Sequence, residues 1–117
     1  MMASGLLMAA LVASIWAIGN GVLHDAFVLA RHEGPYTREL LRLLMDGHIL
    51  ITCGVVYVVA YFLIKQGNAL GPWLCCIAAA SLIVYCAMIF PFLKSFGTVV
   101  INVVVLGMAV FELITDH

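Results

Sequence analysis

Charged residues are scarce in this sequence. It has five Lys and Arg and six Asp and Glu among 117 residues, a charged fraction of 9%, while 66% of the residues are hydrophobic. Soluble domains are about 25% charged and about half apolar. The composition therefore excludes a water-soluble globule, because so few polar side chains cannot cover its surface, and it also excludes intrinsic disorder. A net charge of −1 gives no electrostatic support for a nucleic-acid partner, so we expect none.

Motifs of redox and metal chemistry are missing as well. No Cys-x-x-Cys pair occurs, which disfavours thioredoxin-like or quinone-reductase chemistry. No His-x3-His or Glu-x2-His spacing occurs either, so the ligands of a metal site would have to come from two helices. We predict no cofactor. We expect the four cysteines to be small buried hydrophobic residues: Cys53, Cys75, Cys76 and Cys86.

Long stretches without charge dominate the rest of the chain, at 1–24, 47–64, 66–93 and 95–111. Crossing a bilayer core about 30 Å thick takes roughly 17–25 apolar residues in a helix. Helices satisfy their own backbone hydrogen bonds, which lipid requires. The sequence therefore predicts an all-α integral membrane protein with one domain, 1–117. We place its four transmembrane helices at about 3–32, 36–65, 72–91 and 95–115.

The breaks between these helices are short and contain Gly34-Pro35, Gly71-Pro72 and Pro91. Short connections predict an antiparallel up-down bundle, with Pro35 suited to the first turn of the second helix. The first two predicted helices are about 30 residues long and the last two about 20, or about 45 and 30 Å. We therefore expect the first hairpin to be longer than the second and to project beyond the bilayer.

Basic residues are distributed unevenly between the two ends of this bundle. Arg31, Arg38, Arg42 and Lys94 fall at one end, and only Lys65 falls at the other. Because cytoplasmic loops are enriched in Lys and Arg, the loops between helices 1 and 2 and between helices 3 and 4 are predicted to be cytoplasmic. Both termini would then lie outside a plasma or inner membrane.

Small residues recur at every fourth position of the first helix: Gly5, Ala9, Ala13, Ala17 and Gly21. Such a stripe allows close backbone approach, which favours helix association in lipid. We predict a packing seam along this stripe. The partner helix could belong to the same chain or to a second copy, so a homo-oligomer formed through the stripe is one expectation.

Most of the charge is concentrated around the first predicted turn. Seven of the charged residues lie between 25 and 46, and His24, His32 and His48 lie in or beside that window. Folding the hairpin about Pro35 brings His24 level with Asp46, near one membrane boundary. The candidate ligand residues of this polar cluster are Asn20, His24, Asp25, Arg42, Asp46 and His48.

Three interpretations of the polar cluster remain open. It could be structural, with Arg42 pairing with Asp46 or Asp25 and His24 bonding to Asp46. It could be a ligand or proton-transfer site, because ionisable groups at membrane depth are costly and often functional. It could hold a metal through His24, Asp46 and His48. Deeper in the spans lie the polar residues Asn102, Tyr57, Tyr61 and Tyr85, of which Asn102 is suited to an interhelical hydrogen bond.

The favoured function is non-enzymatic: binding of a partner protein or of lipid through the 25–46 hairpin. One alternative is a small-molecule or proton-coupled transporter that acts as an oligomer. Another is a membrane-embedded enzyme or metal-binding protein that uses His24, Asp46 and His48. The size and four-span layout resemble those of the small multidrug-resistance transporters. That family needs a membrane-embedded Glu in its first helix, and no acidic residue precedes Asp25 here, so we reject that assignment.

Overall fold

The structure, a computed structural model, describes residues 2–91 and 95–115. These residues form four helices: α1 (Met2–Arg31), α2 (Arg38–Lys65), α3 (Leu70–Ile89) and α4 (Phe96–Thr115). Each helix is long and apolar enough to cross a membrane, which confirms the prediction of an all-helical chain with four such segments. The first two helices have 30 and 28 residues, and the last two have 20 each.

The start of α2 differs from the prediction. The helix begins at Arg38 because Thr37 is its N-cap, with an extended backbone and a hydroxyl oxygen that accepts a hydrogen bond from the Leu40 amide at 3.2 Å. Pro35 therefore lies in the connecting segment and not in the first helical turn, where we expected it. Gly34 has a φ of 100°, a conformation that glycine adopts without steric cost.

The ends of α3 also differ from the prediction. The helix starts at Leu70, whose amide donates to the Asn68 side chain at 2.9 Å. Pro72 then lies within the first turn, where its missing N–H is not needed. The helix ends at Ile89, two residues before Pro91, because a proline disfavours helical geometry at the residue preceding it.

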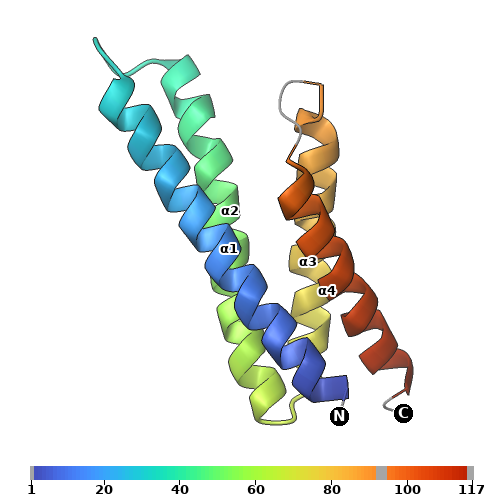
Figure 1. Cartoon of the computed structure of the whole chain (residues 1–117). Coiled ribbons are helices and arrows are strands. Elements are labelled where there is room, and N and C mark those ends of the chain that lie inside the picture. The colour runs from blue at the N-terminus through green and yellow to red at the C-terminus, as the bar shows by residue number, and fades with distance from the viewer. Residues whose placement is uncertain (1, 92–94, 116–117) are drawn as a thin grey trace.

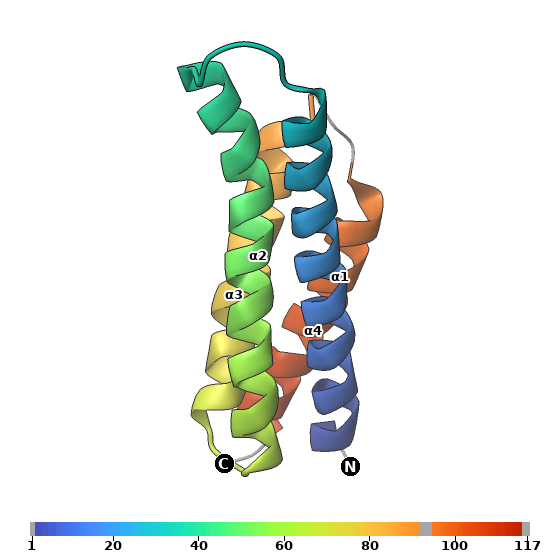
Figure 2. The ribbon, with the colours of Figure 1, turned by 90° about the vertical axis from the view of Figure 1, so that its left-hand side faces the viewer.

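The four helices are arranged as two pairs, α1 with α2 and α3 with α4 (Figures 1 and 2). Successive helices run in opposite directions, and both termini lie at the same end of the molecule. Extensive packing joins α2 to α3 and α1 to α4 as well. The two pairs lie close together at the end that holds the termini, and they separate toward the end that holds the α1–α2 connection (Figure 1).

The predicted small-residue stripe of α1 packs inside this chain. Ala13, Ala17 and Gly21 are buried, whereas Gly5 and Ala9 are half-buried. Gly21 faces Gly47 of α2, and a Cβ atom on Gly21 would lie 2.6 Å from the Gly47 carbonyl oxygen. The buried part of the stripe is thus covered by other helices of the same chain. A homo-oligomer stays a prediction, and within the stripe only the half-buried Gly5 and Ala9 are open to a second copy.

Candidate functional site

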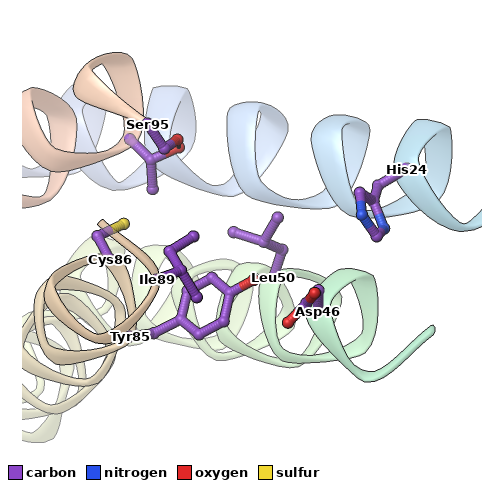
Figure 3. Close-up of a pocket in the computed structure, with 8 residues that line it drawn as sticks. His24, Asp46, Leu50, Tyr85, Cys86, Ile89 and Ser95 are labelled. Carbon is purple, nitrogen blue, oxygen red and sulfur yellow. Dashed lines mark hydrogen bonds between the residues drawn. The ribbon is translucent and has the colours of Figure 1, made fainter. Parts of the chain in front are cut away.

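A cavity of about 280 Å³ lies between the two helix pairs (Figure 3). Its position is the separated end of the bundle, where α3 ends and α4 begins. All four helices and the segment just before α4 contribute to its lining: His24, Asp46, Leu50, Tyr85, Cys86, Ile89, Ser95 and Thr98.

His24 and Asp25 form the one ion pair found among the described residues, with 3.2 Å between Nδ1 of His24 and Oδ1 of Asp25. A carboxylate can only accept a hydrogen bond, so the proton of a neutral His24 ring is assigned to Nδ1, and Nε2 keeps its lone pair. Gly47 makes room for this pair. A side chain at Gly47 would collide with the Asp25 carboxylate and would lie 2.7 Å from the Gly21 carbonyl oxygen.

Asp46 lines the cavity from α2, and it has no cationic partner within the part of the chain that the structure describes. Tyr85 of α3 lines the same cavity as Asp46 (Figure 3). Figure 3 shows Asp46 and His24 on facing helices around the cavity. The two side chains do not form a direct ion pair. The sequence predicted that His24 and Asp46 lie at the same depth. In the structure both side chains line one cavity, but they do not contact each other.

The ion pairs expected for Arg42 are absent. Arg42 is exposed on α2, and neither Asp46 nor Asp25 lies within 4.0 Å of its guanidinium. A long arginine side chain at an exposed position reaches solvent, where an ion pair contributes only about 0–1 kcal/mol. The structure thus corrects the expectation that Arg42 neutralises the two aspartates.

Two other candidate residues lie away from the cavity. His48 is exposed, and its Nε2 lies 3.4 Å from the Thr52 hydroxyl one turn later. Asn20 is exposed and donates to the Trp16 carbonyl oxygen at 2.8 Å. Across residues 2–91 and 95–115, no three His, Cys, Asp or Glu side chains converge on one point. His24, Asp46 and His48 therefore do not form a three-ligand metal centre.

Below the cavity a chain of hydrogen bonds leads into the bundle. The Ser95 hydroxyl and the Trp16 indole N–H both donate to Oγ1 of Thr98, each at 3.0 Å. The Asn102 amide donates to the Thr98 carbonyl oxygen at 2.7 Å, and the Tyr57 hydroxyl donates to Oδ1 of Asn102. Asn102 thus makes an interhelical hydrogen bond between α4 and α2.

The remaining tyrosine candidate, Tyr61, is half-buried. It packs edge-on against Phe62, with ring centroids 5.3 Å apart. It belongs neither to the cavity lining nor to the hydrogen-bond chain. Of the four intramembrane polar candidates, Tyr85 therefore belongs to the cavity, and Tyr57 and Asn102 belong to the polar chain below it.

Sequence reasoning missed Ser95 and Thr98 at the cavity and Trp16 beside it. The available signal was the run from Ser95 to Thr98, in which two hydroxyl residues flank the small residue Gly97 at the start of the last span. In the structure Gly97 lies against the Trp16 ring, and a Cβ atom there would lie 2.8 Å from the ring carbon Cζ2. The pairing of a residue in the first helix with one in the last is a tertiary feature that local spacing does not reveal.

Comparison of the chain with protein-family models, with curated proteins and with solved structures finds no match in any of the three.

Proposed function

We propose that this chain is an antiparallel four-span membrane protein that binds a lipid-like amphiphile between its two helix pairs. The headgroup occupies the cavity, and the apolar tail leaves it toward the surrounding bilayer. The observation that carries the proposal is the mixed lining of the cavity. His24, Asp46 and Tyr85 supply polar groups, whereas Leu50 and Ile89 supply an apolar wall. Such a combination matches a molecule with one polar end and one apolar end.

The lengths of α3 and α4 support this placement. Twenty residues at 1.5 Å per residue span about 30 Å, which is the thickness of the hydrocarbon core of a bilayer. The cavity lies where α3 ends and α4 begins, and thus at one boundary of that core. Lipid headgroups reside at this level, so a bound lipid would enter the cavity without changing its depth in the membrane.

The charged tip of the α1–α2 hairpin sets the proposed orientation. Arg31, Arg38 and Arg42 are exposed there, and the guanidinium of Arg31 lies 4.1 Å from the centre of the Phe27 ring. Lys94, counted with them in the sequence, lies outside the described residues. An excess of basic residues favours the cytoplasmic side. We therefore place the projecting hairpin in the cytoplasm. The headgroup cavity then lies at the cytoplasmic boundary of the membrane.

The interior geometry favours binding over transport. The hydrogen-bond chain below the cavity ends at Tyr57. Beyond it, toward the termini, the buried side chains of the described helices are apolar, as at Leu6, Ala10, Ala60 and Ile64. A transport path would need polar groups or water through that region. The cavity therefore supports an amphiphile-binding role better than a polar route across the bundle.

The experiment that tests this proposal fills the cavity with a large side chain. Leu50→Trp places an indole on the apolar wall, and Leu41→Trp is the matched control, since Leu41 is exposed on the same helix and does not line the cavity. Both proteins are extracted from vesicles containing equal parts of phosphatidylethanolamine, phosphatidylcholine and phosphatidylglycerol. Native mass spectrometry then counts the lipids that remain bound to each chain.

We expect the unmodified chain and Leu41→Trp to retain one lipid per chain, and Leu50→Trp to retain about ten times less. Equal retention by all three proteins would show that the cavity is not the binding site. Circular dichroism of each variant checks that the helices are preserved.

A further inference from the structure

The chemistry of the cavity also indicates which headgroup it accepts. Resting on the proposed function, we infer that the cavity selects a primary ammonium group, such as that of an aminophospholipid. Three features of the described lining support it: its hydrogen-bond acceptors, a carboxylate with no Lys or Arg beside it, and a single aromatic ring.

The donors of the cavity are largely engaged within the protein. The Ser95 hydroxyl donates to Oγ1 of Thr98. The ring proton of a neutral His24 is directed at Asp25. The described lining thus keeps acceptors at Asp46 and at Nε2 of a neutral His24, while the protons of Ser95 and His24 are engaged within the protein. A ligand rich in N–H donors complements such a lining.

The charges of the cavity point to a cation. Asp46 is half-buried and lines the cavity, whereas no Lys or Arg is among the described residues that line it. His24 is hydrogen-bonded to Asp25, and no Lys or Arg lies within 4.0 Å of the Asp46 carboxylate among the described residues. A partly buried charge is stabilised by pairing and hydrogen bonding. An ammonium group between Asp46 and His24 would supply both, and an anionic headgroup would be repelled.

The lining also distinguishes primary from quaternary ammonium groups. Quaternary groups are typically bound in cages of several aromatic rings, and Tyr85 is the one aromatic residue among the described residues that line the cavity. A primary ammonium group carries three N–H donors. The Asp46 carboxylate, Nε2 of His24 and the Tyr85 oxygen are three acceptors contributed by three different helices, so the site matches the primary group.

The test compares three kinds of vesicle that share one neutral background lipid without a phosphate group. The minor component of each is phosphatidylethanolamine, phosphatidylcholine or phosphatidylglycerol. The amount of each that co-purifies per chain is measured by native mass spectrometry. We expect phosphatidylethanolamine to bind about tenfold more tightly than either other lipid. Equal binding of all three would overturn the inference.

Two variants assign the selectivity to the cavity. Asp46→Asn removes the charge and is expected to lower phosphatidylethanolamine binding about tenfold, the fold-change expected for a hydrogen bond to a charged group. Tyr85→Phe removes one acceptor and is expected to lower it about threefold. Glu33→Gln is the control, because Glu33 is an exposed carboxylate outside the cavity. If Asp46→Asn folds and keeps the full preference, the inference is wrong. If it does not fold, Tyr85→Phe and the lipid series still decide the question.

Free ethanolamine distinguishes a lipid from a soluble amine. Displacement of the lipid by millimolar ethanolamine would show that the site recognises the ammonium group alone. No displacement, together with selective lipid binding, would show that the acyl chains are also required. Failure of the headgroup inference is separable from failure of the proposed function. In the first case Leu50→Trp still removes bound lipid but no headgroup is preferred, and in the second case Leu50→Trp has no effect.

Discussion

Two adjacent faces of α2 form interfaces of different character. Toward α1, Gly47 and Gly54 bring the two backbones together, and a Cβ atom on Gly54 would lie 3.0 Å from the Ile18 amide nitrogen. On the neighbouring face, Asp46 and Leu50 line a cavity. The same helix is thus closely packed on one face and open on the next. The comparison shows that side-chain size at each interface position decides where neighbouring helices approach closely.

The inner side of α3 shows the same effect along its length. Near the start of α3, Gly71 lies against α2, and a Cβ atom there would lie 2.8 Å from the Ile64 amide nitrogen. Ala78 and Ala79 continue this buried side with small residues. Near the end of α3, the larger residues Tyr85 and Ile89 face the cavity. Small residues thus lie where the helix pairs are close, and large ones where they separate (Figure 1).

The largest expected effect comes from disrupting the α1–α2 interface. Gly47→Leu would collide with the Asp25 carboxylate and with the Gly21 carbonyl oxygen, and backbone atoms cannot move aside as a flexible side chain does. Overpacking of a close interface typically costs about 1–3 kcal/mol, and we expect about 3 here. The measurement is the free energy of unfolding by SDS titration in detergent micelles.

Gly19→Leu is the matched control for Gly47→Leu. Gly19 is a helical glycine of α1 with no atom within 4 Å of its Cβ position, so leucine there should leave the free energy of unfolding nearly unchanged. Equal effects of the two substitutions would contradict the importance assigned to the close α1–α2 interface.

An intermediate effect is expected at the polar contact between α2 and α4. Asn102→Leu leaves the buried Tyr57 hydroxyl without its acceptor. A buried unsatisfied group costs about 1–3 kcal/mol, although hydrogen bonds between membrane helices contribute about 0.6 kcal/mol on average. We expect a loss of about 1–2 kcal/mol. A double-mutant cycle with Tyr57→Phe, measured by the same unfolding titration, should give a coupling energy of about 1 kcal/mol. Strictly additive effects would show that this hydrogen bond does not stabilise the contact.

The smallest effect is expected at the exposed end of the α1–α2 pair. Arg42→Ala removes a cation that forms no ion pair with the described carboxylates. Surface substitutions of this kind stay within about 0.5 kcal/mol. The sequence alone suggested that Arg42 stabilises Asp46 or Asp25, which would make the loss much larger. A decrease of more than about 1 kcal/mol in the free energy of unfolding would instead show that Arg42 does stabilise one of the two aspartates.

The helices were predictable because their signals are local. Charge-free stretches longer than a bilayer core, bounded by Gly34-Pro35 and Pro91, identify four apolar helices regardless of how they pack. Errors arose at helix ends, where competing caps decide the boundary. Thr37 caps α2 with its side chain, so the helix starts after it, whereas Pro35 had suggested an earlier start.

The candidate site was predictable only in part. The common depth of His24 and Asp46 follows from counting residues on either side of the turn, and both line one cavity. The contributions of Ser95 and Thr98 depend on how the second helix pair packs against the first. The partner of each charge also depends on side-chain direction, and for this reason the sequence did not show that Arg42 and His48 lie apart from the cavity lining.

The sequence by itself determined that this chain forms four apolar helices with its charges gathered near one turn, because hydrophobicity, helix length and turn residues act locally along the chain. Only the tertiary structure decided that Asp46 has no cationic partner among the described residues, that Gly47 makes room for Asp25 and that a cavity lies between the two helix pairs. These features depend on which side chains of sequentially distant helices contact one another, and the steric fit between the helices determines those contacts.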